Sequence, residues 1–170
     1  MRKKCLAGVL TAVVMMSAAA VDDFPPVDDF PPVDDFPRVT TAEQYCMAES
    51  MYFEARSEGW RGMLAVGVVI KNRMTSARYP DTACAVVHQG SERRDRRCQF
   101  SYFCDGLPEV PADAELWSLA QRLSDAVLRT DKIIMREVGD ATHYHSTTVC
   151  PWWSEALTRT GALGAHIFYL

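Results

Sequence analysis

The sequence predicts a mainly α-helical single domain with a small irregular or β element. Three observations support this fold class. Apolar residues recur at helical spacing in three segments, near residues 41–56, 61–74 and 112–128. From Gly139 onward the pattern breaks into short apolar pieces, of which ATHYHS alternates as a strand does. Residues 39–170 are numerous enough to bury one hydrophobic core unaided.

The residues before position 39 are expected to lie outside this domain. Residues 1–20 have the form of an export signal, with a basic start, a short apolar run and the small-residue sequence SAAA. The apolar run is shorter than the roughly 20 residues of a membrane-spanning helix, so we expect cleavage and no stable membrane insertion. Residues 21–38 read VDDFPP, VDDFPP and VDDFPR, and their prolines and paired aspartates predict a disordered linker.

The first two helices of the domain follow one another closely. Thr41 and Gln44 fit a capping box at the start of the first, which is expected to run to about residue 56. Gly59 would end it. The second helix, over residues 61–74, contains Gly62 and Gly67, which permit close packing against a neighbouring helix. The apolar stripe of the first helix consists of Tyr45, Ala48, Tyr52 and Ala55.

The rest of the domain alternates between loops and one long helix. A turn at YPD precedes a short helix over residues 82–89, and residues 90–112 are expected to be irregular. The arginine-rich piece SERRDRR in this region is interpreted as a solvated loop, with binding of an acidic partner as the alternative. Residues 39–170 hold 14 Lys and Arg against 16 Asp and Glu, which argues against nucleic-acid binding.

Three carboxylates stand in the apolar, aromatic-rich segment 46–73, namely Glu49, Glu54 and Glu58. Burial disfavours a charged carboxylate and raises its pKa, and a protonated carboxyl is what general acid catalysis on a glycosidic bond requires. Glu54 is the candidate acid because aromatic residues flank it. Glu58, four residues on, would share its helix face as a supporting charge, and Arg56 or Arg73 would oppose the pKa rise. Glu49 is expected to be solvated or ion-paired.

Five cysteines follow the linker, which in an exported protein predicts disulfides with one cysteine left over. Cys98 and Cys104 flank five residues and form a candidate bridge. Cys46 and Cys84 are the second candidate pair, which leaves Cys150. The sequence alone does not fix the pairing. A cysteine nucleophile is the less favoured alternative, since exported cysteines are usually oxidised.

His143 and His145 raise the alternative of a zinc site. In a short strand both rings would lie on one face, but catalytic zinc needs three protein ligands and no third ligand is identified. A zinc amidase is therefore less favoured, and no metal or cofactor is expected. The adjacent Trp152 and Trp153 cannot both point inward from one element, so one of them would line a groove.

Six pieces of the sequence resemble the cell wall hydrolase family typified by the spore cortex-lytic enzymes of bacilli. In order they are YFEARSE, GMLAVGVVIKNRM, YPDTACAVVHQ, CQFSYFCDG, ATHYH and GAHIFY, and the pieces CQFS, CDG and THYH resemble its Gram-negative branch. The resemblance implies a lysozyme-like fold and cleavage of peptidoglycan glycan strands, most simply by a lytic transglycosylase. Glu54, in FEAR, matches the family's proposed catalytic glutamate. Ser57 departs from the usual glycine.

Four further residues are candidates for substrate contacts or support. Gln99 and Ser101 would hydrogen-bond the sugar N-acetyl groups, with capping of loop backbone as the alternative. Tyr144 would orient Glu54 or touch the substrate, with His143 beside it, and the alternative is a half-buried strand tyrosine. A muramidase-type hydrolase and a non-catalytic peptidoglycan-binding protein are the alternative functions. Peptidoglycan is the expected partner, in the periplasm or cell envelope, and the need for an activator is left open.

Overall fold

The computed structural model describes residues 42–92, 98–130, 133 and 135–170. The expected signal, the linker, Thr41 of the capping box and the arginines of the SERRDRR piece lie outside these residues. Among the residues described, no helix is long and apolar enough to cross a membrane.

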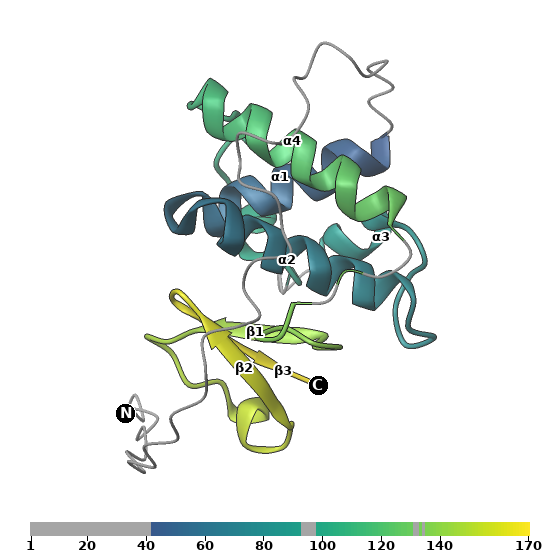
Figure 1. Cartoon of the computed structure of the whole chain (residues 1–170), viewed down its shortest axis with the longest axis vertical. Coiled ribbons are helices and arrows are strands. Elements are labelled where there is room, and N and C mark those ends of the chain that lie inside the picture. The colour runs from purple at the N-terminus through teal and green to yellow at the C-terminus, as the bar shows by residue number, and fades with distance from the viewer. Residues whose placement is uncertain (1–41, 93–97, 131–132, 134) are drawn as a thin grey trace, which may run out of the picture.

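The α-helices pack together as a bundle, and a small sheet lies against the bundle on the side of α2 (Figure 1). α1, α2 and α4 pack on one another, while α3 contacts α1 and α2. This arrangement confirms the mainly helical fold class with a small β element. The helical elements in chain order are α1 (Ala42–Ala55), η3 (Arg56–Glu58), α2 (Gly59–Met74), α3 (Ala83–Val87), η4 (Ser101–Cys104), α4 (Ala114–Arg129) and η5 (Trp152–Glu155).

A sharp turn separates α1 from α2. Ala55 ends α1 with φ −142°, the short helix η3 follows, and Gly59 has φ +67°, in the left-handed region that favours glycine. Gly67 then allows α2 to pack closely on α1, because a Cβ at this position would overlap the side chain of Met51. Both expected helices are confirmed, and so is the close packing at Gly67.

Three hydrogen bonds fix the start of α4. The Asp113 carboxylate accepts a hydrogen bond from the Leu116 N–H at 2.9 Å and caps the helix. The Tyr52 hydroxyl, on α1, accepts from the N–H groups of Ala112 and Asp113 at 3.1 and 3.0 Å. α4 therefore begins at Ala114, directly after its cap and slightly later than the expected start near Ala112.

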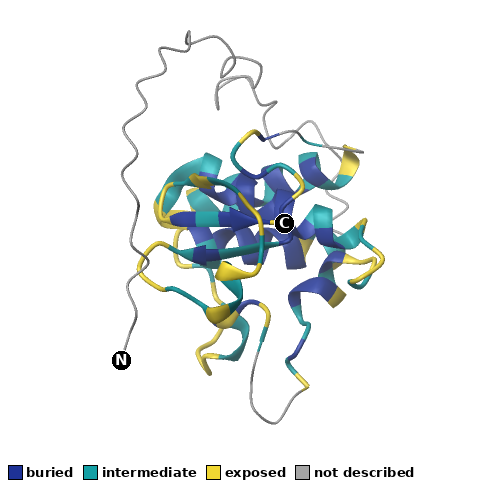
Figure 2. Ribbon diagram, turned by 90° about the horizontal axis from the view of Figure 1, so that it is seen from below, coloured by how far each residue is buried: buried dark blue, intermediate teal, exposed yellow. Residues whose placement is uncertain are grey.

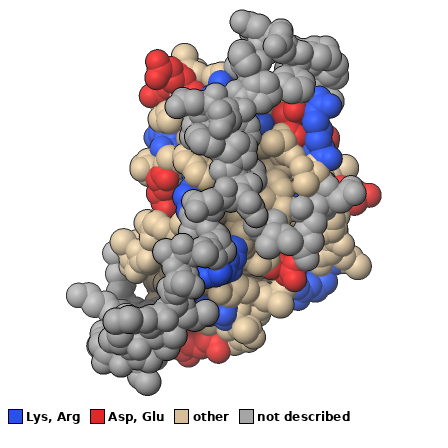
Figure 3. All heavy atoms as spheres, in the orientation of Figure 1, with Lys and Arg blue, Asp and Glu red and all other residues tan. Residues whose placement is uncertain are grey.

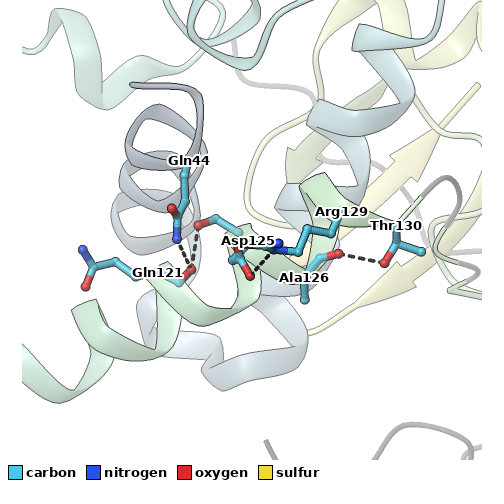
Figure 4. Close-up of polar contacts among 7 residues, drawn as sticks. Gln44, Gln121, Asp125, Ala126, Arg129 and Thr130 are labelled. Carbon is cyan, nitrogen blue, oxygen red and sulfur yellow. Dashed lines mark hydrogen bonds and ion pairs between the residues drawn. The ribbon is translucent and has the colours of Figure 1, made fainter. Parts of the chain in front are cut away.

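Polar contacts also join α1 to the middle of α4. The Gln44 side-chain amide donates to the backbone carbonyl of Gln121 at 3.1 Å, as the close-up in Figure 4 shows. Near the end of α4, Arg129 pairs with Asp125 at 2.7 Å, one turn earlier on the same helix. This second pair is solvent-exposed and contributes at most about 0.5 kcal/mol to stability.

Three antiparallel strands make up the sheet, in the order β1-β3-β2. They are β1 (His143–Ser146), β2 (Arg159–Leu163) and β3 (His166–Tyr169). Tyr144 on β1 lies opposite Phe168 on β3, and a bulge interrupts the β2–β3 register between Arg159 and Gly161. The strand expected in ATHYHS is confirmed. The β2–β3 hairpin was not predicted, because its strands are short and β2 contains a glycine and exposed residues.

The hydrophobic core lies between α1, α2 and α4 and extends to the sheet, as the buried residues in Figure 2 show. Core residues include Met47, Met51, Leu64, Val68, Leu123 and Phe168.

Both candidate disulfides are formed: Cys46–Cys84 joins α1 to α3, and Cys98–Cys104 closes the loop around η4. None of the cysteines in the described part of the chain is a free thiol, so the expectation that Cys150 is left over is not upheld.

The surface carries both charge signs in small, separate groups. On the face shown in Figure 3, the Lys and Arg atoms alternate with Asp and Glu atoms. The mixed surface agrees with the small net charge counted from the sequence, −4 for the whole chain.

Candidate active site

Glu54 lies at the C-terminal end of α1, partly buried and facing the sheet. The Tyr144 hydroxyl donates a hydrogen bond to Glu54 Oε2 at 3.1 Å, and the backbone N–H of Ser101 donates to the same carboxyl group. Burial raises the pKa of Glu54 above its ordinary value, although these two hydrogen bonds and the charge of Arg73 each act to lower it. Glu54 thus combines a raised pKa with a fixed orientation.

Tyr144 projects from β1 toward the helices and is held by two rings of β3. The ring of His166 meets it edge-on at 5.1 Å between centroids, and the ring of Phe168 lies at 6.0 Å. Burial, followed by the nearby Glu54 charge, raises the pKa of Tyr144 well above its ordinary value. The hydroxyl therefore stays protonated and acts as a donor to Glu54.

Arg73 is a buried cation behind this pair. It comes from the last turn of α2, is 2% exposed, and its Nε donates to the Thr142 carbonyl at 2.7 Å. The guanidinium lies 5.3 Å from the ring centroids of both Tyr79 and Phe100. Its positive charge lowers the pKa of Glu54. Of the two arginines expected to do this, Arg56 instead lies over aromatic rings of α1 and is exposed.

Glu54 and Glu58 do not share a helix face, contrary to the expectation from their spacing. α1 ends at Ala55, and Glu58 belongs to the separate helix η3. Glu58 Oε1 lies 3.0 Å from His166 Nδ1, and Glu58 Oε2 accepts from the Ala165 N–H at 3.0 Å. Both of its oxygens are therefore engaged by the turn between β2 and β3.

The expectation that Glu49 is solvated or ion-paired is wrong. Its side chain is buried, with the residue 6% exposed, and it accepts a hydrogen bond from the Tyr102 hydroxyl at 3.4 Å. The same hydroxyl lies 2.9 Å from Ser50 Oγ. Burial raises the pKa of Glu49. Part of the signal for this site is local, since Tyr45, one turn earlier on α1, also hydrogen-bonds Glu49, but Tyr102 lies far away in the chain.

The remaining candidates occupy different places around Glu54. Gln99 and Ser101 have exposed side chains, and Ser101 reaches Glu54 through its backbone N–H, a contact that residue type cannot reveal. His143 lies 3.4 Å from the Tyr79 hydroxyl and 3.0 Å from Thr142 Oγ1. Burial lowers the pKa of His143, with a smaller effect of nearby arginines, which favours the neutral ring.

The opposite face of the sheet carries the two histidines of HYH. His143 and His145 both contact Trp153, at ring-centroid distances of 5.4 and 5.6 Å, which confirms that they share a face. Across the described ranges, no group of three histidine, cysteine or acidic residues is arranged to hold a metal ion. Trp152 is 87% exposed while Trp153 packs on the sheet, so only one of the adjacent tryptophans points inward.

Comparisons with known proteins agree on one family. The model of the cell wall hydrolase family matches residues 57–169. A spore cortex-lytic enzyme of Halalkalibacterium halodurans is 28% identical over 123 residues, which cover 72% of this chain and 33% of that protein. A spore cortex-lytic enzyme of Oceanobacillus iheyensis is 46% identical over 43 residues, covering 25% of this chain and 16% of that protein. The chain thus spans a third or less of these relatives.

Solved structures give the same answer for the fold. The catalytic domain of the germination-specific lytic transglycosylase SleB from Bacillus anthracis superposes with a TM-score of 0.59 at 26% identity, covering 79% of this chain and 100% of that one. The catalytic domain of the Bacillus cereus SleB protein gives 0.56 at 26% identity, covering 79% and 94%. The fold is therefore the lysozyme-like one that the resemblance implied. With most of its length matched by the family model, this chain belongs to the cell wall hydrolase family.

Proposed function

We propose that this protein cleaves the glycan strands of peptidoglycan as a lytic transglycosylase, with Glu54 as general acid and base. The observation that carries the proposal is the Glu54 carboxyl group, raised in pKa by burial and oriented by the Tyr144 hydroxyl at 3.1 Å. Family membership and the likeness to SleB catalytic domains support the substrate class. The family match begins at residue 57, so the role of Glu54 itself rests on the site and on the FEAR resemblance.

In the first step, protonated Glu54 gives its proton to the glycosidic oxygen that leaves C1 of N-acetylmuramic acid. The C1–O bond breaks, and positive charge develops at C1. The new Glu54 carboxylate is stabilised by the donors already in place, the Tyr144 hydroxyl and the Ser101 N–H, and by the positive charge of Arg73. Tyr144, Ser101 and Arg73 therefore favour the ionised carboxylate that this step generates.

In the second step, the Glu54 carboxylate takes the proton of the sugar's own C6 hydroxyl. The C6 oxygen attacks C1 and closes a 1,6-anhydro ring, which returns Glu54 to its protonated form. An intramolecular nucleophile explains how a single carboxylate suffices where hydrolases commonly use two. In the alternative muramidase reaction, water attacks C1 and the product keeps a reducing end.

A digest of purified sacculi by the full chain tests the proposal. We expect turbidity to fall and mass spectrometry to find soluble muropeptides with anhydro-muramic ends. Reducing ends would establish a muramidase instead. Sacculi that bind the protein but stay intact would contradict enzymatic function and support a peptidoglycan-binding protein.

Export to the periplasm or cell envelope is part of the proposal. The signal-like residues 1–20 and the disulfides Cys46–Cys84 and Cys98–Cys104 support an oxidising compartment. Peptidoglycan lies in the same compartment, so the location and the proposed substrate agree.

We expect Tyr144→Phe to lower the cleavage rate roughly 10- to 100-fold, because a hydrogen bond to a charged group is worth about 1.5–3 kcal/mol. The lost hydrogen bond favoured the carboxylate, so the pKa of Glu54 should rise further and the alkaline limb of the pH–rate profile should move to higher pH. Tyr169→Phe is the matched control, because that hydroxyl contacts His145 at 3.0 Å on the other face of the sheet. An unchanged profile in Tyr144→Phe would contradict the assignment.

Arg73→Met should move the same alkaline limb upward, because the positive charge of Arg73 lowers the pKa of Glu54. Arg73→Lys, which keeps a cation, should leave the limb nearer to its position in the wild type. The measurement is kcat/KM against pH for the three proteins. A limb that moves downward in Arg73→Met would show that the charge does not act on Glu54 in this way.

A further inference from the structure

We propose that Glu58 and His166 are positioning residues that hold Tyr144 against Glu54. This inference rests on the proposed function of Glu54. The α1–η3 corner is joined to the sheet at two points, by Glu54 to Tyr144 and by Glu58 to the β2–β3 turn. Together these contacts fix where the sheet lies relative to the end of α1.

The contacts of Glu58 show that it is a binding partner of the turn. One oxygen accepts from His166 Nδ1 and the other from the Ala165 N–H, both at 3.0 Å. The Glu58 and His166 side chains are only 14% and 9% exposed. Gly164 has φ +54°, and a Cβ there would overlap the Glu58 carboxylate. With both oxygens engaged and little exposure, Glu58 is unsuited to act as a second catalytic carboxylate.

The β2–β3 turn positions the Tyr144 ring, which orients Glu54. His166 and Phe168 stand two residues apart on β3, so their side chains lie on the same face of the sheet. The Tyr144 ring contacts both of them, at 5.1 and 6.0 Å between centroids. A shift of His166 would therefore move the Tyr144 hydroxyl away from Glu54 Oε2. Misplacement of a catalytic contact by about 1 Å can cost on the order of 100-fold in rate.

Three variants separate the parts of this arrangement. Glu58→Gln keeps the size of the side chain but leaves one acceptor oxygen for two donors. His166→Phe keeps a ring against Tyr144 and loses the bond to Glu58, whereas His166→Asn keeps a donor near Glu58 and loses the ring. We expect each variant to lower kcat roughly 10-fold or more with little change in KM. Glu58 and His166 position the catalytic acid through Tyr144 and do not bind the sugar.

The decisive experiment is a double-mutant cycle with Tyr144→Phe. If Glu58 acts through Tyr144, then Glu58→Gln should lower kcat in the wild type and cause no further loss in Tyr144→Phe. The loss of thermal stability should be similar in both backgrounds. Glu137→Gln is the matched control, since it removes another part-buried charge pair, with Arg61 at 2.9 Å, that does not contact Tyr144. An equal fold-loss of kcat from Glu58→Gln in both backgrounds would overturn the proposal.

A second readout keeps this test independent of the proposed activity. The pKa of Glu54 can be followed by NMR titration of its side-chain carboxyl carbon. We expect Glu58→Gln and His166→Asn to raise it toward the value in Tyr144→Phe. If Glu58→Gln does not fold, His166→Asn serves alone. A Glu54 titration that neither variant changes would overturn the positioning role, whereas intact sacculi with a changed titration would overturn only the proposed function.

Discussion

Glu54→Gln should lower the rate of glycan cleavage by about 10²- to 10⁴-fold, the usual contribution of a general acid–base residue. Glutamine has nearly the same size and keeps an oxygen that can accept from the Tyr144 hydroxyl, now at 3.1 Å from Glu54 Oε2. It cannot, however, deliver a proton to the leaving oxygen. The measurement is the initial rate of muropeptide release from purified sacculi, with circular dichroism to verify the fold.

Glu49→Gln is the matched control for this substitution. Glu49 also lies on α1, is buried and has a pKa raised by burial, but its hydrogen bonds come from Tyr102 and Tyr45 and not from Tyr144. It should keep most of the wild-type activity. Cleavage that survives in Glu54→Gln, or that is lost equally in both variants, would remove the catalytic assignment of Glu54.

Replacing Cys46 and Cys84 together by serine should lower the free energy of unfolding by roughly 3–4 kcal/mol. This disulfide joins α1 to α3 across a sequence separation of 38 residues, so it restricts a large loop of the unfolded chain. Such a loss is a large part of the 5–15 kcal/mol typical of a domain. Denaturant unfolding of the variant and the wild type under oxidising conditions measures it.

The Cys98–Cys104 disulfide provides the comparison, because its separation is only 6 residues. Its removal should cost less, roughly 2 kcal/mol by the same chain-entropy relation. Removal of Cys98–Cys104 should also lower activity more than removal of Cys46–Cys84 does. The loop that Cys98–Cys104 closes contains Ser101, whose backbone N–H donates to Glu54. A larger stability loss for the short loop than for the long one would contradict this account of the two disulfides.

The helices were predictable because their signals are local. The apolar stripes, Gly59 at the corner and Gly67 at the α1–α2 contact all act within a few turns of chain. The sheet was harder to predict. Its register pairs Tyr144 with Phe168 through contacts distant in sequence, and strands of 4–5 residues carry little periodic signal.

In the candidate site, too, residues with a local signal could be predicted from the sequence, whereas backbone contacts and contacts between distant residues could not. Glu54 stood out because a carboxylate among aromatic residues is unusual, and Tyr144 was a candidate because it stands between two histidines in a short predicted strand. The Ser101 contact uses a backbone N–H, which no residue type encodes. The helix break at Ala55, which directs Glu58 to His166, reversed the expectation of a shared helix face.

Burial should keep Glu54 protonated until it meets a glycan, and titration of its carboxyl carbon tests this directly. With Glu54→Gln to assign the resonance, we expect a midpoint above the ordinary glutamate value of about 4.3. We also expect this midpoint to coincide with the alkaline limb of the cleavage rate, because activity is lost as the acid ionises. A midpoint at or below the ordinary value would show that burial does not keep Glu54 protonated.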